Sequence, residues 1–206
     1  MIHLFLLALL LIAAAFIGGL VFAYRKLPKC IFIALILTLV AVPVASFKMY
    51  ERRFMLSAVP DALGVSSIVY SEEESWGFGP GGNEAGIRVY PLPEHVSKEI
   101  EARGIDFFTT MPPNTDQNER EWRGRYTNWE ETPIKTGRHW NLGKEGKLLD
   151  IYDYICAYGF CIDIKPEIES LANGIVSAPG SYYAYGRIGV IVVSPGHNLV
   201  LYLYNG

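Results

Sequence analysis

Large aromatic side chains and arginines alternate along one polar stretch, residues 118–140. Tryptophan, tyrosine and arginine are the residue types that most often anchor protein interfaces, and a tryptophan ring can also stack on a sugar ring. The residues concerned are Trp122, Tyr126, Trp129, Trp140, Arg120, Arg123, Arg125 and Arg138. Of these, we take Trp122, Arg123, Arg125 and Trp129 as candidate contacts to a protein partner. Two alternatives stay open: the rings cover the edge of the core, or they bind a glycan such as peptidoglycan.

A glycine-rich loop at residues 76–83 is the second candidate site. Loops that bind phosphate need a strand before them and a helix N-terminus after them, often with a lysine and a hydroxyl. Here the segment that follows, residues 87–90, has the composition of a strand. We therefore expect a structural loop or a partner-contact loop, with Trp76, Asn83 and Glu84 as its candidate contact residues.

No motif for catalysis or for metal binding is specific enough to name a reaction. The four histidines are not spaced as metal ligands, and Ser194 stands before Pro195-Gly196 rather than in a G-x-S-x-G elbow. A Ser/His/Asp triad assembled from distant positions stays open. We predict no catalytic residue, no metal and no cofactor. The histidines are His3, His95, His139 and His197.

Two of the three cysteines, Cys156 and Cys161, are separated by four residues that include Gly159. A chain reversal at the glycine would bring their Cα atoms within disulfide range. A disulfide would indicate an oxidising compartment, whereas the alternative makes both cysteines small core residues. Two cysteines without a further Cys or His pair form an incomplete zinc site.

Apart from His3, the residues named above follow two long apolar runs, residues 2–24 and 30–47, which contain no charged side chain. A run of about 20 apolar residues matches the thickness of the hydrocarbon core of a bilayer. The first run has no Lys or Arg before it and is longer than a signal-peptide core, which favours an anchor. Ala15, Gly19 and Ala23 recur at a spacing of four, so we expect the two helices to pack on each other.

Counting positive charges does not settle the orientation of this hairpin. Three positive residues lie in the loop at residues 25–29, and three follow the second run, at Lys48, Arg52 and Arg53. The higher density in the loop favours a cytoplasmic loop, with both termini outside. We therefore expect a bacterial inner-membrane protein with a periplasmic domain.

The domain is acidic. From residue 54 onward there are 12 Lys and Arg against 20 Asp and Glu, which leaves a formal charge of −8. Nucleic acids and anionic lipid surfaces require clustered Lys and Arg, so neither is expected as the partner of this domain. A basic partner protein fits the charge.

Strand and helix signals alternate without regular βαβ repeats, which predicts an α+β domain with a largely antiparallel sheet and about three helices. We divide the chain into a transmembrane hairpin (1–50), a connector (51–63) and one extracytoplasmic domain (64–206). We expect strands at 65–70, 87–90, 105–110, 160–164, 182–193 and 199–204, and helices from 93 to 103, near 148–155 and from 166 to a stop at 173–174.

The sequence thus favours a membrane-anchored extracytoplasmic binding protein. An immunity or inhibitor protein that neutralises a basic toxin is one concrete form, because an acidic surface attracts a basic partner. Two other classes stay open: an envelope enzyme acting on peptidoglycan or lipid, and an accessory subunit of a membrane complex in which the hairpin is the contact surface.

Overall fold

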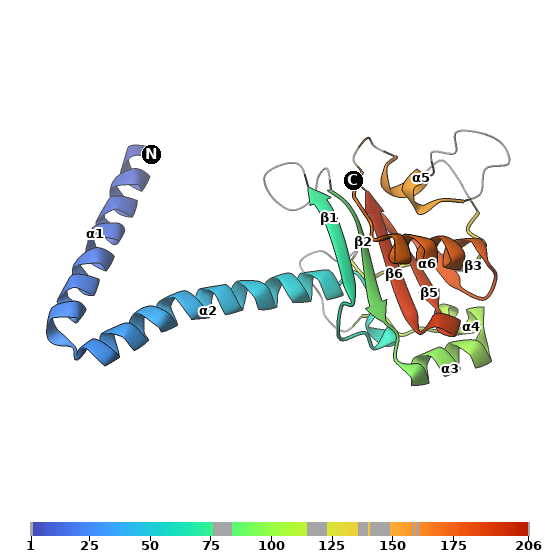
Figure 1. The fold of residues 1–206 in the computed structure, drawn as a ribbon, viewed down its shortest axis with the longest axis horizontal. Helices are drawn as coiled ribbons and strands as arrows, with labels where there is room; N and C mark the ends of the chain where they lie inside the picture. The colour runs from blue at the N-terminus through green and yellow to red at the C-terminus, as the bar shows by residue number, and fades with distance from the viewer. Residues whose placement is uncertain are drawn as a thin grey trace. The chain divides into compact units, whose positions relative to one another are not determined.

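The computed structural model describes residues 2–75, 84–114, 123–135, 140, 149–157, 159 and 161–205. The chain divides into two compact units, Met1–Arg53 and Phe54–Gly206 (Figure 1). We call the second the C-terminal unit.

Helices α1 (Ile2–Lys26) and α2 (Lys29–Leu56) are long and apolar enough to cross a membrane. At the turn between them, the Tyr24 ring meets the Phe32 ring edge-on at 5.2 Å between centroids, and the Lys29 ammonium lies 3.3 Å from the Tyr24 centroid. A Cβ at Gly19 would meet no described atom within 4 Å outside its own helix. At Gly19 itself, the close packing expected along this stripe of small residues is therefore not seen.

The C-terminal unit is built on one antiparallel sheet, as the sequence predicted. Among the described residues the strand order is β1-β2-β6-β5-β4-β3, and every neighbouring pair is antiparallel. The strands are β1 (Tyr70–Ser75), β2 (Glu84–Pro91), β3 (Glu130–Glu131), β4 (Tyr182–Tyr185), β5 (Gly189–Ser194) and β6 (Leu199–Asn205). The helices are α3 (Glu94–Arg103), α4 (Ile105–Thr109), α5 (Ile151–Ile155) and α6 (Pro166–Ser177), with 3-10 turns η1 (Asp61–Leu63) and η2 (Pro195–His197).

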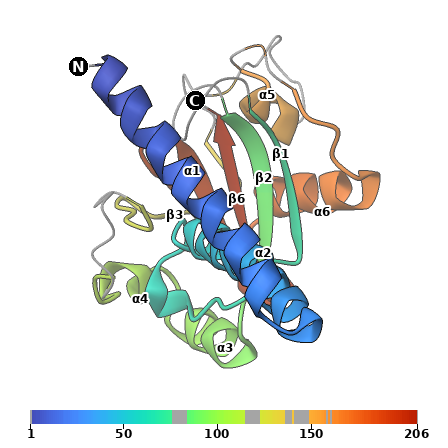
Figure 2. The same cartoon turned by 90° about the vertical axis from the view of Figure 1, so that its left-hand side faces the viewer.

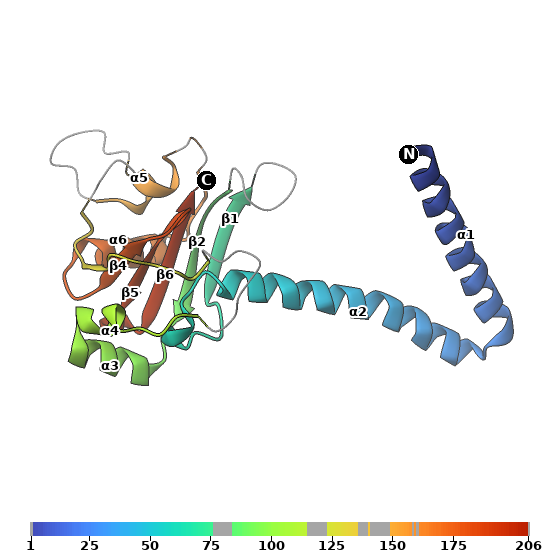
Figure 3. The ribbon, with the colours of Figure 1, turned by 180° about the vertical axis from the view of Figure 1, so that it is seen from behind.

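Both faces of the sheet are covered by apolar clusters. Figures 1 and 3 show the sheet from opposite sides. Because side chains alternate along a strand, Ile87 and Val89 of β2 enter one cluster together with α5 and α6. Tyr90 enters the other, with residues 56–68, α3 and α4. We call these the α6 face and the α3 face; α3 and α4 lie next to each other in Figure 2.

Several sequence predictions are confirmed. Helix α3 follows Pro93 and ends before Gly104, whose φ of +59° takes the backbone out of the helix. The strand expected at residues 87–90 forms the middle of β2, and β5 pairs with β6 across η2.

Two strand predictions are wrong. Residues 105–109 form helix α4, which buries the adjacent Phe107 and Phe108 together, as a strand could not do on one face. The strand expected at 65–70 starts only at Tyr70 and continues through the glutamates to Ser75. Val65 and Ile68 pack against the α3 face without a strand partner, and the glutamates are tolerated because β1 is an edge strand.

Three further boundaries differ from prediction. Among the described residues of 160–164 there is no strand, although Ile162 and Ile164 are buried on the α6 face. Helix α6 continues through Asn173 to Ser177, because the Asn173 side chain accepts a hydrogen bond from Ile151 N at 2.8 Å instead of ending the helix. The long strand expected at 182–193 is two strands, reversed where Gly186 N donates to Gly189 O at 2.7 Å.

Candidate functional site

A buried arginine lies in the middle of β2, on the α3 face. Arg88 is 5 % exposed and forms an ion pair with Glu73 of β1, and the hydroxyl of Tyr204 donates to the same carboxylate. The guanidinium carbon lies 4.7 Å from the Tyr204 ring centroid. Gly86 makes this arrangement possible, since a Cβ at that position would overlap the Tyr204 ring. An ion pair and a hydrogen bond, both to Glu73, therefore hold edge strand β1 to the sheet.

The electrostatics of this group follow from its burial. Burial raises the pKa of Tyr204 far above its usual value, against the lowering effect of Arg88. Burial acts to lower the pKa of Arg88, but the neighbouring Tyr204, Tyr90 and Glu73 outweigh it and the pKa is raised. Arg88 is thus a permanent buried cation that is compensated by Glu73.

A second buried arginine forms hydrogen bonds at the C-terminal end of α2. Arg123, 8 % exposed, donates from Nη2 to Phe54 O at 2.8 Å and from Nε to Ser57 Oγ at 2.9 Å. Its guanidinium carbon also lies 3.8 Å from the Phe54 ring centroid. The last carbonyls of a helix have no partner within it and attract positive charge. The position therefore gives Arg123 the role of a helix cap.

Two tyrosines, Tyr90 of β2 and Tyr126 of the segment before β3, bind carbonyls of the same chain segment. Tyr90 donates to Met55 O at 2.9 Å, and Tyr126 donates to Ala58 O at 2.7 Å. Burial raises the pKa of both hydroxyls. We call the whole group the arginine–tyrosine cluster; its members are Glu73, Arg88, Tyr90, Arg123, Tyr126, Tyr202 and Tyr204.

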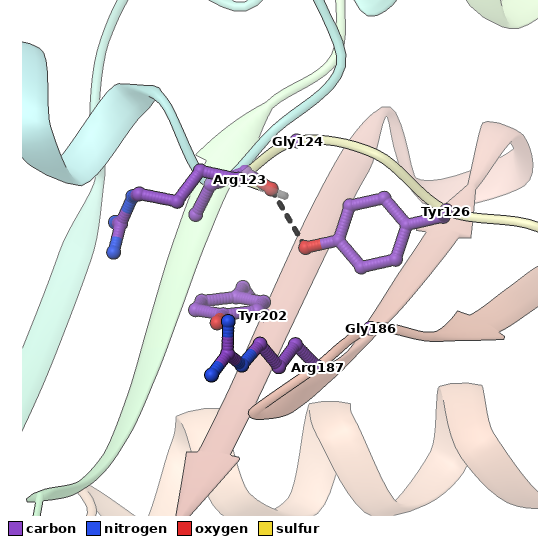
Figure 4. A pocket seen from close by; sticks show the side chains of 7 residues that line it. Arg123, Gly124, Tyr126, Gly186, Arg187 and Tyr202 are labelled. Carbon is purple, nitrogen blue, oxygen red and sulfur yellow. Dashed lines mark hydrogen bonds between the residues drawn. The ribbon is translucent and has the colours of Figure 1, made fainter. Parts of the chain in front are cut away.

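A small cavity of about 10 Å³ lies beside the cluster (Figure 4). In Figure 4 the guanidinium of Arg123 points away from Tyr126, and its hydrogen bonds go to the end of α2. This volume has room for about one water molecule and none for a substrate. The residues lining the cavity are Ala58, Arg123, Gly124, Tyr126, Gly186, Arg187 and Tyr202.

Of the seven residues predicted from the sequence to contact a partner, the structure describes four: Glu84, Arg123, Arg125 and Trp129. Trp76, Asn83 and Trp122 lie outside the described residues. Glu84 begins β2 and is half-buried, and Arg125 is exposed. No contact with a partner is tested at any of these positions, so their role stays a prediction.

The other two predicted contacts are built into the fold. Arg123 caps α2 and belongs to the arginine–tyrosine cluster. Trp129 is half-buried, with its ring stacked on Phe108 at 4.3 Å between centroids and its indole N–H buried without a hydrogen-bond partner in the described part of the chain. Their positions favour the alternative that these side chains extend the core; whether either also contacts a partner is untested.

Most of the cluster was missed by sequence reasoning. Two signals could have revealed it: an arginine between Ile87 and Val89 of a buried strand, and two tyrosines, 202 and 204, on one face of the last strand. A charge at a core position of a strand requires a partner, which predicts a buried ion pair.

A serine and a histidine do meet at η2. Ser194 Oγ lies 2.9 Å from His197 Nδ1, and Ser181 donates to Ser194 Oγ at 2.8 Å. Ser194 is only 1 % exposed, so no substrate carbonyl can reach it. The three side chains hold β4, β5 and η2 together, and their geometry does not support a nucleophilic role for Ser194.

Cys156 and Cys161 form a disulfide, with a Cα–Cα distance of 4.8 Å. The bond links the end of α5 to the segment that places Ile162 and Ile164 in the core. Cys30 is a free, exposed thiol near the start of α2. No group of three His, Cys, Asp or Glu side chains able to hold a metal ion occurs within the described ranges.

No protein-family model, no curated protein and no solved structure matches this chain.

Proposed function

We propose that α1 and α2 form a transmembrane hairpin whose loop faces the cytoplasm, and that the C-terminal unit lies in the periplasm of a bacterium. The length and apolar composition of both helices support the membrane placement. The dense positive charge of the loop at residues 25–29 supports the orientation. The disulfide fits an oxidising compartment.

Within that setting, the chain is a membrane-anchored binding protein, and its most specific form is an immunity or inhibitor protein that holds a basic partner protein. The observation that carries this proposal is the net acidic charge of residues 54–206; among the described residues, the cavity of about 10 Å³ beside Arg123 does not offer a substrate site. The polar groups around it hold the end of α2 and leave no space for a substrate. The charge of −8 on residues 54–206 selects the class of partner.

The test is site-specific photo-crosslinking in intact cells that carry the full chain. The crosslinking amino acid replaces exposed Arg125, in the aromatic and arginine-rich segment, or exposed Lys98 on α3 as the matched control. A single adduct with a basic protein at position 125, absent at position 98, is the expected result. Absence of any adduct at 125, or capture of acidic proteins alone, contradicts the proposal.

A second candidate is supported by a separate observation. The open space around Gly19 leaves its small-residue stripe available to a helix of another membrane protein. In that case the chain is an accessory subunit, and Gly19→Leu should reduce the size of the complex on a native gel. An unchanged size would remove this candidate and leave the binding proposal intact.

A further inference from the structure

Strand β1 forms one edge of the sheet and pairs on its inner side only, with β2. Among the described residues no strand pairs with its outer side. The opposite edge, β3, is only two residues long, and its Glu130 side chain is bound by Lys135 at 2.7 Å. Since an open edge exposes a row of backbone donors and acceptors, the six-residue β1 is the longer template for another strand.

The inner side of β1 is held in place. Glu73 is tied to Arg88 and Tyr204, and the Tyr70 hydroxyl accepts a hydrogen bond from Lys165 N at 3.2 Å. A strand fixed by side chains on both faces loses little conformational freedom when another strand pairs with it.

The exposed side chains on the two faces of β1 define the chemistry of the partner. Ser71, Glu72 and Ser75 are exposed, and Val69, just before the strand, is 64 % exposed. Because β1 carries three successive glutamates, antiparallel pairing with a second copy would place carboxylates close to carboxylates, which is unfavourable. A strand with lysine or arginine opposite Glu72 is favoured instead.

We propose that the outer edge of β1 binds an extended lysine- or arginine-bearing segment of a partner protein by strand addition. This inference rests on the proposed function as a binding protein and names the surface and the recognition mode. Backbone hydrogen bonds supply affinity in this mode, and the side chains select the sequence. The competing explanation is that the glutamates only protect the edge from aggregation.

The test uses the full chain in detergent micelles and a fluorescent probe peptide of four Lys-Val repeats, followed by fluorescence anisotropy. Three peptides are compared: the probe, a Glu-Val peptide of the same length, and the Lys-Val peptide methylated at every backbone nitrogen. The last keeps the charge but cannot donate a backbone hydrogen bond. Strand addition predicts binding of the probe, at least about tenfold weaker binding of the methylated peptide, and no binding of the Glu-Val peptide.

A pair of variants locates the site. Glu72→Lys should weaken binding of the probe about fivefold, whereas Glu101→Lys, the same charge change at an exposed position of α3, should leave it within about twofold. Hydrogen exchange should show slower exchange of the β1 amides only when the unmethylated Lys-Val peptide is present.

Equal binding of the methylated and unmethylated peptides would overturn strand addition, as would equal effects of the two variants or no binding at all. The photo-crosslinking experiment distinguishes this failure from failure of the proposed function. A basic adduct at position 125 together with no peptide binding at β1 would reject the site and keep the binding function.

Discussion

Arg88 is the residue on which the geometry of the sheet edge depends. It is a buried cation in an acidic unit, and its carboxylate partner belongs to the edge strand. Breaking a buried ion pair usually costs more than its contacts suggest, because the remaining charge loses its partner. Glu73 keeps 32 % of its side chain exposed, so water recovers part of that cost.

We predict that Arg88→Met lowers the free energy of unfolding by about 2 kcal/mol in urea at neutral pH. The matched control is Arg103→Met on α3, which removes an exposed ion pair with Glu99, a hydrogen bond to Thr110 and a ring contact with Phe107, and should cost less than about 1 kcal/mol. Similar losses for both variants would show that Arg88 contributes no more than a surface arginine.

The tyrosines of the cluster give a prediction about alkaline pH. Burial raises the pKa of Tyr90, Tyr126 and Tyr204 in the folded state, whereas all three ionise near pH 10 once unfolded. Their contribution is therefore fully present below about pH 10 and is lost as the pH rises above it. Ultraviolet absorbance should show these hydroxyls ionising only together with unfolding; ionisation of every tyrosine near pH 10 in the folded protein would contradict this.

At the residue scale, the sequence shows which residue types gather in one segment but not which distant segments they contact. The alternation of arginine and aromatic residues predicted Arg123 and Trp129 as partner contacts, which stays a prediction. Their burial depends on the segments 54–59 and 105–109, which are distant in sequence. Nothing in the local pattern indicates that Arg123 meets the end of α2. Conversely, Arg88 was overlooked because a single charge in a short strand resembles an edge residue.

At the element scale, Gly124 decides how two chain segments meet. Its φ is +67°, and a Cβ would lie 3.0 Å from Ser57 O and 3.1 Å from Val59 O. Gly124→Ala should therefore cost about 2 kcal/mol of stability in urea unfolding. Gly174, inside α6 with open space around its Cβ position, is the control: Gly174→Ala should stabilise the protein by about 0.5 to 1 kcal/mol. A loss at position 174 equal to that at 124 would contradict this account.

The disulfide belongs to the same scale because it joins α5 to the core segment at residues 162–164. Replacing Cys156 and Cys161 together by serine should lower stability by about 2 kcal/mol, the value expected for closing so short a loop. Thiol labelling of the denatured chain should find one reactive cysteine without reductant and three with it. Three reactive thiols in protein taken directly from cells would show that the bond does not form there.

Element types were predictable where local signals were strong, as at Pro93 and Gly104 around α3. The predictions were wrong where tertiary contacts decide whether a segment forms a helix or a strand. Residues 105–109 have strand-forming composition, yet the stacking of Phe108 on Trp129 and the burial of Phe107 require a helix. The strand at 70–75 was missed because its glutamates are compatible with a strand only at the edge of a sheet.

At the scale of the whole molecule, two long apolar helices precede an acidic unit whose sheet, within the part of the chain that the structure describes, has no strand paired with the outer side of β1. The apolar runs and the acidic charge are both evident in the sequence. The function that they support depends on which side of the membrane the acidic unit occupies. A periplasmic position makes a disulfide and a basic extracellular partner compatible with the chain. In the cytoplasm the disulfide would not be expected to form, and a basic partner outside the cell could not reach the acidic unit.

A pair of reporter fusions measures this directly. Alkaline phosphatase, active only outside the cytoplasm, is fused after Asn205, and the matched control is fused after Lys26 in the loop between α1 and α2. The account predicts an active enzyme at the C-terminus and an inactive one in the loop. Activity in the loop with none at the C-terminus would contradict the proposed orientation, and with it the periplasmic binding function.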